Sequence, residues 1–279
     1  MLKLVNQPPG TPASYPARDV VDAGFLQLVR YGILAHDDPL IVDSLRVVDA
    51  ILKVDTPYGP CWRRYNHDGY GQRRDGGPFV TWGQGRPWPL LTGERGHYEL
   101  AAGRDVRPFL RAMEQFSNGT GMLPEQIWDE DDLPDAHMRR GGPTGSATPL
   151  LWAHSEYLRL LRSRRDGSVF ELIPEVADRY RRKPPQSRIE YWLPKHPIRQ
   201  ARKNHTLRIC APAPFRLHWS HAGETRWQDA ESQPTGVGGE YVDLGSADFE
   251  PYTEFTFFWK DRGAWEGRNY RVDAYQENR

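Results

Sequence analysis

The strongest constraint on the fold is a change in the spacing of the apolar residues near residue 183. Before this point, apolar residues recur at the three- and four-residue spacing of amphipathic helices. After it, they alternate in short runs that are typical of β-strands. The chain has 279 residues, enough for two ordinary domains. We therefore expect a helical domain over residues 1–183 and a β domain over residues 184–279.

The spacing of apolar residues in the first region, residues 1–183, is mainly that of α-helices. Asp38-Pro39 is typical of an N-cap followed by proline at the first helical position. Long polar loops, over residues 58–86 and 119–147, separate the helical segments, and loops of this length in a compact domain are often functional. Successive helices predict an all-α layer architecture. The helical segments are residues 20–34, 38–54, 87–103, 105–116, 148–164 and 170–182.

The second region has the pattern of short strands separated by turns. Its runs are rich in β-branched and aromatic residues, and turn clusters stand at residues 212–214 and 236–239. This pattern predicts a small antiparallel β-sandwich. The alternating runs are residues 207–211, 215–219, 254–260 and 270–275.

Charge, cysteine content and missing motifs argue against several classes. The 37 basic and 37 acidic residues balance, whereas nucleic-acid binders carry a basic excess. Two cysteines, Cys61 and Cys210, are too few for a disulfide framework or a zinc site, so we expect free and mostly buried thiols. No glycine-rich phosphate loop is present, and we expect no cofactor.

Membrane and export signals are also missing from the sequence. It has no run of about 18 apolar residues that would predict a membrane span. The start, MLKLVNQPPG, lacks the apolar region of a signal peptide. If Met1 is the true start, this favours a cytoplasmic location.

Aromatic residues are abundant, with 10 Trp and 13 Tyr. Such residues suit a surface that stacks on flat apolar faces such as sugar rings, although they also fill cores. The loop at residues 61–71 combines aromatics with Arg64 and Asp68, which could grip a polar, flat ligand or could form a charged surface loop. The loop at residues 123–129 places Glu125 beside Pro and Gln, as either a general base or a glutamate on a loop at the start of a helix.

An acidic run follows Glu125, from Asp129 to Asp135. It lacks the Asp/Asn alternation and central glycine of an EF-hand loop. We expect a solvated acidic loop rather than a metal site.

Taken together, several segments resemble glycoside hydrolase family 15, the bacterial and archaeal glucoamylases and glucodextranases. The similarity extends to the β region through LRICAPAPFRLHWS and FTFFWKDRGAWEGRNY, which resemble the C-terminal β domain of bacterial relatives. In the helical region it is carried by VVDAGFLQLVRYGI, WRRYNHDGYG, GQGRPWPLLTGERGHYELAAG, LPEQIWD and GSATPLLWAHSEYLRLLRS.

The resemblance implies an (α/α)6 barrel, of which this chain carries the second half, and inverting exo-hydrolysis of α-glucosidic bonds. Glu125 matches the general base of the family, and Arg64 matches the arginine that holds the terminal glucose. Three further residues, Tyr65, Asp68 and Trp88, match positions that line or support the glucan pocket. The implied partner is an α-glucan or oligosaccharide substrate.

An inverting enzyme needs a second carboxyl group, about 6.5–9.5 Å from the base. In the resembling family this acid lies well upstream, and no segment before Glu125 resembles its motif. We therefore expect the chain to be truncated, or to be one piece of a split enzyme with a separate N-terminal barrel half. The alternatives are a non-catalytic carbohydrate-binding or accessory protein and a non-functional remnant.

Overall fold

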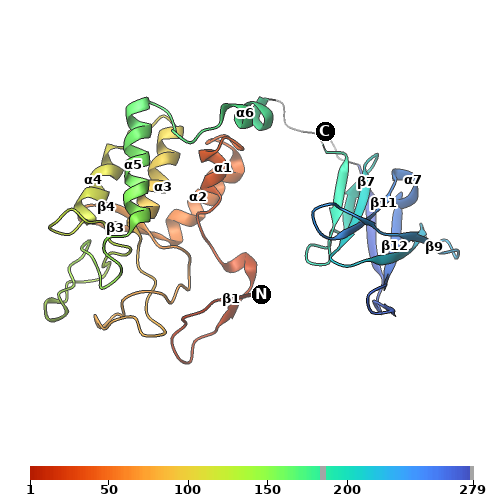
Figure 1. Ribbon diagram of the computed structural model, residues 1–279, viewed down its shortest axis with the longest axis horizontal. Helices are drawn as coiled ribbons and strands as arrows, with labels where there is room; N and C mark the ends of the chain where they lie inside the picture. Colours follow the sequence, from red (N-terminus) through yellow and green to blue (C-terminus); the bar gives the residue numbers. More distant parts are fainter. Residues whose placement is uncertain (183–186, 277–279) are drawn as a thin grey trace. The chain divides into compact units, whose positions relative to one another are not determined.

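The computed structural model describes residues 1–182 and 187–276, which belong to two compact units. The units are Met1–Pro184 and Pro185–Arg279 (Figure 1). The boundary that the sequence predicts near residue 183 lies outside the described residues. No helix in the described parts of the chain is long and apolar enough to cross a membrane.

The first unit is mainly helical, with a short hairpin, β3 (Lys53–Thr56) and β4 (Gly59–Trp62), between its second and third helices. A small ribbon, β1 (Leu2–Lys3) and β2 (Ser14–Tyr15), precedes the helices. The helices are α1 (Leu26–Arg30), α2 (Pro39–Ile51), α3 (Pro89–Ala101), α4 (Arg107–Phe116), α5 (Leu151–Asp166) and α6 (Pro174–Ala177). Short helical turns are η1 (Ala17–Asp19), η2 (Pro134–Ala136) and the π-helical η3 (Asp178–Arg182).

The start of α2 confirms the predicted cap. The Asp38 side chain accepts a hydrogen bond from the backbone N–H of Leu40 at 2.9 Å, and Pro39 occupies the first helical position. The first backbone N–H groups of a helix have no partner within the helix. The Asp38 carboxylate satisfies one of them, and Pro39 has no N–H to satisfy.

Two predicted helices are shorter than their apolar patterns suggest. Residues 20–25 are not helical, because the Asp22 carboxylate accepts the Gly24 N–H at 2.7 Å and closes a local turn. The predicted helix at residues 170–182 becomes α6 and η3, because Pro174 starts a helix and cannot continue one. The hairpin β3–β4 was not predicted, and it begins inside the segment that was expected to extend α2.

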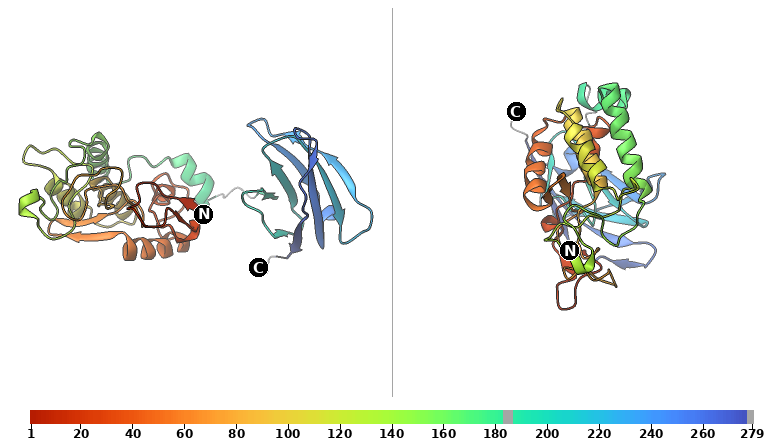
Figure 2. Two further views of the ribbon diagram at one scale, coloured as in Figure 1. Left: turned by 90° about the horizontal axis from the view of Figure 1, so that it is seen from below. Right: turned by 90° about the vertical axis from the view of Figure 1, so that its left-hand side faces the viewer.

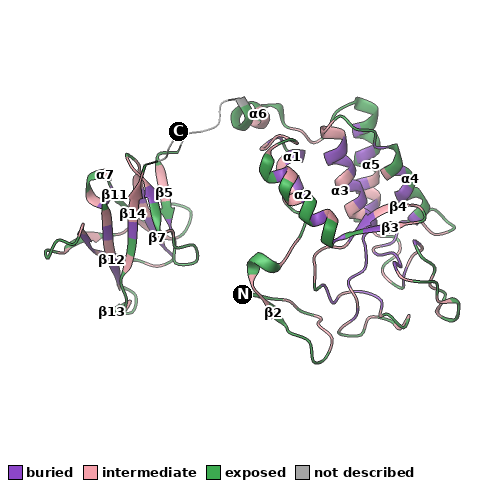
Figure 3. Ribbon diagram, turned by 180° about the vertical axis from the view of Figure 1, so that it is seen from behind, coloured by how far each residue is buried: buried purple, intermediate pink, exposed green. Residues whose placement is uncertain are grey.

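Helix α3 lies at the centre of this unit and contacts α1, α4 and α5. Glycines allow the close approach: a Cβ atom at Gly93 would lie 2.5 Å from Cγ of Glu156, and one at Gly96 would lie 2.5 Å from Cδ2 of Leu160. Figure 3 shows the buried residues concentrated on the facing sides of these helices. The two long loops extend from one end of this helical layer (Figure 1).

A buried cluster of charged residues joins α1, α3 and α5. The Arg30 guanidinium donates to both carboxylate oxygens of Glu156, at 2.9 and 3.0 Å, and also pairs with Glu171. His97 Nδ1 lies 2.8 Å from the same Glu156 carboxylate. Because a buried charge is costly unless it is paired, these contacts fix how the three helices meet.

Within residues 187–276, the second unit forms two sheets. One has the order β10-β11-β7-β5 and the other β6-β14-β12-β8-β9, with β13 beside β12. One short helix, α7 (Ser246–Phe249), precedes β12. The strands are β5 (Ile189–Trp192), β6 (Gln200–Arg202), β7 (Thr206–Ala211), β8 (Phe215–His221), β9 (Gln228–Glu231), β10 (Gln233–Pro234), β11 (Glu240–Leu244), β12 (Tyr252–Trp259), β13 (Ala264–Trp265) and β14 (Tyr270–Tyr275).

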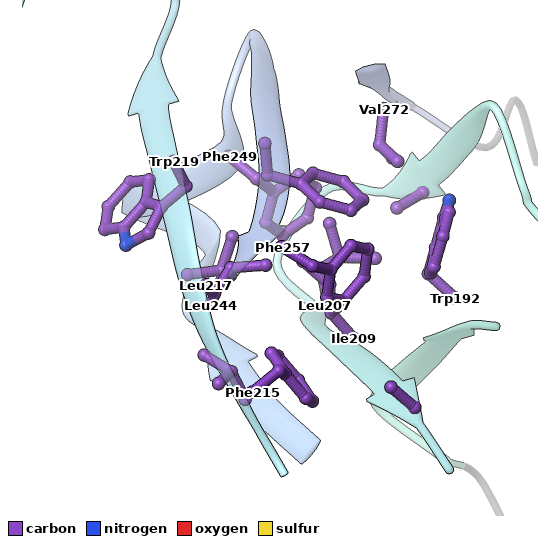
Figure 4. Packing of buried hydrophobic residues seen from close by; sticks show 14 of the residues in the cluster. Trp192, Leu207, Ile209, Phe215, Leu217, Trp219, Leu244, Phe249, Phe257 and Val272 are labelled. Carbon is purple, nitrogen blue, oxygen red and sulfur yellow. The ribbon is translucent and has the colours of Figure 1, made fainter. Parts of the chain in front are cut away.

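The two sheets share one apolar core. Residues of β7 alternate between buried and half-buried positions, and Leu207 and Ile209 point inward (Figure 4). Phe215, Leu217 and Phe257 reach the same core from the second sheet. The left view of Figure 2 shows the strands of this unit as two layers.

The prediction that this region is purely antiparallel is wrong at two strand pairs. Strand β5 runs parallel to β7, and β6 runs parallel to β14. The cause is a crossover: after β5 the chain passes to the other sheet as β6 and then returns as β7. Two neighbours joined through such a crossover can run in the same direction, whereas a hairpin makes them antiparallel. As expected, Cys61 and Cys210 are free thiols, the first buried and the second half-buried.

Candidate active site

The candidate site lies where the two long loops meet the start of α3. Strand β4 leads into the first loop, which carries Arg64, Asp68 and Tyr70. The second loop carries Glu125. Trp88 precedes the first residue of α3. Its backbone N–H donates to the Trp62 carbonyl at 2.9 Å, which ties the helix start to β4.

Arg64 and Asp68 form a two-point ion pair. The guanidinium Nε and one terminal nitrogen donate to the two Asp68 oxygens at 2.9 and 3.0 Å. Asp68 is buried, and it also accepts the Tyr70 N–H at 3.0 Å. Such a paired fork holds the guanidinium in one orientation.

Aromatic rings surround the Arg64 guanidinium. Its carbon atom lies 5.3 Å from the ring centre of Tyr65, 5.0 Å from that of Tyr70 and 4.9 Å from that of Trp88. These are cation–π distances. The site therefore offers a fixed cation among flat apolar surfaces.

Tyr70 connects Glu125 to the aromatic residues around Arg64. The Tyr70 hydroxyl lies 3.1 Å from one Glu125 carboxylate oxygen and 3.4 Å from the other. The loops are tied together beside this contact, because the Gln126 side chain donates to the Tyr70 carbonyl at 3.0 Å. The Glu125 N–H donates to the Ala147 carbonyl at 2.8 Å, which fixes the backbone at the carboxylate.

The pKa shifts of two residues reflect this arrangement. Burial raises the pKa of the Tyr70 hydroxyl, and the charge of Glu125 raises it further. Burial works against the charged form of Arg64, but the hydrogen bonds and charge of Asp68 outweigh it, with help from Glu125, and raise the pKa of Arg64. The charge of Glu125 thus acts on the Arg64 guanidinium.

Tyr70 is the contact residue that the sequence prediction did not select. Its signal was present in the motif, as an aromatic between Gly69 and Gly71. A Cβ atom at Gly71 would lie 2.4 Å from the Gln84 carbonyl oxygen, and one at Gly69 would lie 1.8 Å from that of Asn6. Glycine on both sides lets the loop pack against other backbone while Tyr70 turns toward Glu125.

The acidic run beyond Glu125 is exposed at Asp131, Asp132 and Asp135, as predicted, but its first residue corrects the prediction. Asp129 is buried and not solvated, because Arg86 donates to it at 2.6 Å and Arg63 pairs with its other oxygen. Arg86 also lies over the Trp128 ring at 4.0 Å. These contacts tie the second loop to the first loop, which carries Arg63 and Arg86. Within residues 1–182 and 187–276, no group of three or more His, Cys, Asp and Glu could hold a metal ion.

Comparisons with known proteins agree on one family. The family model of glycosyl hydrolases family 15 matches residues 10–162. A glucoamylase from Clostridium sp. (strain G0005) is 49% identical over 166 residues, which are 60% of this chain and 22% of that protein. A crystal structure of a bacterial glucoamylase complexed with acarbose superposes with a TM-score of 0.58 at 45% identity, covering 65% of this chain and 25% of that one. The chain thus spans about a quarter of the length of these relatives.

Proposed function

The chain belongs to glycosyl hydrolase family 15, and we propose that its first unit forms part of a glucoamylase-type site that hydrolyses α-glucosidic bonds. The observation that carries this proposal is the contact set around Arg64 and Glu125. A carboxylate, a fixed guanidinium and three aromatic rings lie together at one end of the helices.

Arg64 suits the role of a ligand-holding residue. Its guanidinium is fixed by Asp68. Little conformational entropy is therefore lost when a sugar hydroxyl accepts a hydrogen bond from one of the remaining N–H groups of the guanidinium. Tyr65 and Trp88 flank the guanidinium and can support a sugar ring. The terminal glucose of an α-glucan fits this combination of polar and apolar contacts.

Glu125 suits the role of general base. Its ionised carboxylate would take a proton from a water molecule, whose oxygen then attacks the anomeric carbon on the face opposite the departing glycosidic oxygen. The configuration at that carbon is thereby inverted. The Tyr70 hydroxyl holds the carboxylate in position, at 3.1 Å from one of its oxygens.

The departing oxygen needs a proton from a second carboxyl group. The neighbouring Asp68 is unsuited, because both of its oxygens already accept hydrogen bonds from the Arg64 guanidinium. We propose that the acid comes from a part of the family's (α/α)6 barrel that these 279 residues do not span.

An apolar surface on α5 supports this view. Four large side chains of this helix are at least 38% exposed: Leu151, Trp152, Leu158 and Leu161. Exposed apolar patches of this kind mark contact surfaces. In the proposal, the remaining barrel helices cover them, either as a separate polypeptide or as another part of the same protein.

Glucose release from maltooligosaccharides tests the proposal. We expect none from the purified 279-residue chain, and release when it is co-expressed with the complementary barrel segment of a family 15 glucoamylase. Glu125→Gln should abolish that release, and NMR should show β-glucose as the first product. Release by the chain alone would refute the proposed origin of the acid. Release that persists in the Glu125→Gln complex, or α-glucose as the first product, would refute the role of Glu125.

A further inference from the structure

The start of the chain lies against the loop that carries Arg64 and Asp68. Figure 1 shows the β1–β2 ribbon at the same end of the helical layer as the two long loops. The pairing of Leu2 with Tyr15 closes this ribbon. We call residues 1–22 the N-terminal segment.

Asn66 joins the loop to the end of this segment through both polar atoms of its amide group. Its side-chain oxygen accepts the Val21 N–H at 2.7 Å, and its side-chain nitrogen donates to the Asp19 carbonyl at 2.8 Å. Beside it, Tyr65 pairs with Asp22 as an isolated β-bridge. Two hydrogen bonds from one planar amide fix both the position and the direction of the loop at Asn66.

His67 is held by two other residues of the N-terminal segment. Its carbonyl accepts a hydrogen bond from the Gln7 side chain at 2.7 Å, and its ring stacks on that of Tyr15, with ring centres 4.0 Å apart and an interplanar angle of 8°. The φ angle of His67 is 61°, in the left-handed region that is unfavourable for residues other than glycine. Because such a conformation persists only where its surroundings hold it, these contacts stabilise the backbone at His67.

Gly69 brings the loop backbone directly against the same segment. A Cβ atom at Gly69 would lie 1.8 Å from the Asn6 carbonyl oxygen, so a larger residue would force the two backbones apart. The contact between segment and loop therefore extends from Tyr65 to Gly69.

These contacts surround the ion pair of the candidate site. Arg64 and Asp68 are four residues apart and pair across a turn that contains Asn66 and His67. If the turn lost its support, the guanidinium and the carboxylate would no longer be held face to face. The ligand itself would then have to order the Arg64 side chain, which weakens binding.

We propose that the N-terminal segment holds the Arg64–Asp68 pair in its ligand-binding geometry, a role that rests on the proposed function, in which the ligand is the terminal glucose of an α-glucan. Gln7 and Tyr15 are positioning residues in this proposal, because they act on the ion pair through His67. The segment thus contributes to substrate affinity from outside the pocket.

The second loop holds Tyr70 independently of this segment. The Gln126 side chain donates to the Tyr70 carbonyl at 3.0 Å, and the Tyr70 hydroxyl contacts Glu125. Loss of the contacts at His67 should therefore impair ligand holding by Arg64 more than it impairs the placement of the base. In kinetic terms, KM should rise while kcat changes little, which is the result of losing an interaction made equally in the ground state and the transition state.

The double variant Gln7→Ala/Tyr15→Ala tests the proposal, because it removes both contacts with His67. In the full chain, we expect faster amide hydrogen exchange in residues 62–70, as mass spectrometry would measure. In the complex with the complementary barrel segment, we expect KM for maltoheptaose to rise about two- to tenfold, because the ligand must now order Arg64. The value of kcat should stay nearly unchanged.

Val5→Ala/Ser14→Ala is the matched control. Both positions lie in the N-terminal segment and are exposed, Val5 by 61%, so loop exchange and KM should match those of the parent. Tyr15→Phe keeps the stacking ring and should retain more affinity than Tyr15→Ala. This pair of single variants decides the question if the double variant does not fold.

Unchanged loop exchange in Gln7→Ala/Tyr15→Ala would overturn the proposal, and so would faster exchange with an unchanged KM. An equal rise of KM in the control variant would overturn it as well. A melting temperature and a kcat that fall together at constant KM would show that the segment only stabilises the fold.

The two proposals fail in distinguishable ways. If Glu125→Gln leaves hydrolysis unchanged but KM still depends on Gln7 and Tyr15, the role of Glu125 is wrong and the positioning role stands. If hydrolysis depends on Glu125 and the double variant changes neither loop exchange nor KM, only the further inference is wrong. If the complex releases no glucose, the proposed function fails, and calorimetric binding of maltoheptaose takes the place of KM.

Discussion

Tyr70 and Glu125 are 55 residues apart in the sequence, yet the Tyr70 hydroxyl lies 3.1 Å from a Glu125 carboxylate oxygen. This contact joins the two long loops at the point where the candidate base is placed. Because of this contact, the pKa of the Tyr70 hydroxyl depends on the charge of Glu125.

We therefore predict that Glu125→Gln lowers the pKa of the Tyr70 hydroxyl. Burial, which contributes most to the upward shift, would remain, but the added effect of the carboxylate charge would be lost. NMR titration of ring-labelled tyrosine, assigned with Tyr70→Phe, measures the change.

The control for this titration is Tyr157. Burial and the Glu114 carboxylate raise the pKa of Tyr157 to about 12, independently of Glu125. Its titration should not move in Glu125→Gln. A Tyr70 pKa that also stays unchanged would show that the two side chains do not interact in solution.

A second prediction concerns Arg64→Lys. A lysine cannot reproduce the two-point contact with buried Asp68 or the planar contacts with the rings. We expect binding of a maltooligosaccharide at the proposed site to weaken at least roughly tenfold, as calorimetry would measure, since a hydrogen bond to a charged group contributes about 1.5–3 kcal/mol. Arg74→Lys is the matched control, because Arg74 is largely exposed and pairs loosely with Glu130 at 3.5 Å. Equal losses in both variants would contradict the role of Arg64.

A third prediction follows from Glu94 on α3. Burial, and secondarily the charge of Glu156, raises the pKa of Glu94 to about 7 from an ordinary value of 4.5. Between these values the unfolded chain releases the proton while the folded chain keeps it. The free energy of unfolding should therefore fall as the pH rises from about 4.5 to about 7, by on the order of 2 kcal/mol.

Urea unfolding at a series of pH values, followed by helical circular dichroism, measures this dependence. Glu94→Gln should flatten it in that window, because glutamine has no proton to lose. Glu175→Gln, at an exposed position of α6, should leave it unchanged. An identical slope in the Glu94→Gln protein would rule out Glu94 as the source.

A fourth prediction tests the close helix packing. In Gly96→Ala the new methyl group would meet buried Leu160 at 2.5 Å, so the free energy of unfolding should drop by about 1–3 kcal/mol despite the higher helix propensity of alanine. Gly119→Ala, where no atom lies within 4 Å of the added carbon, is the control. Thermal unfolding compares the two, and an unchanged or higher melting temperature for Gly96→Ala would contradict the packing described.

The local parts of the fold were predictable because their causes are local. The Asp38-Pro39 helix start depends on a few adjacent residues, and the alternation in β7 depends on one strand. The parallel pairs β5–β7 and β6–β14 depend instead on which sheet each edge strand joins, a choice made by tertiary packing. The sequence pattern within a strand does not determine which sheet that strand joins.

The candidate site also combines features that were predictable from the sequence with features that depend on tertiary packing. Motifs in the sequence selected Glu125, Arg64, Tyr65, Asp68 and Trp88, and the structure places Tyr65, Asp68 and Trp88 around Arg64. The contact of Tyr70 with Glu125 could not be predicted, since it depends on how two loops fold against each other. The burial of Asp129 was missed for a similar reason, because its partners Arg63 and Arg86 come from the other loop.

The crossover between the two sheets has a consequence for synthesis of the chain. Strand β14 stands between β6 and β12 in the six-stranded sheet, so the earliest strand of that sheet has its neighbour in the last one. On a ribosome, β6 emerges long before β14 and must wait unpaired until residues 270–275 leave the exit tunnel. This sheet can therefore be completed only after β14 has been synthesised, and a ribosome that stalls before that point would present an open strand edge to chaperones and proteases.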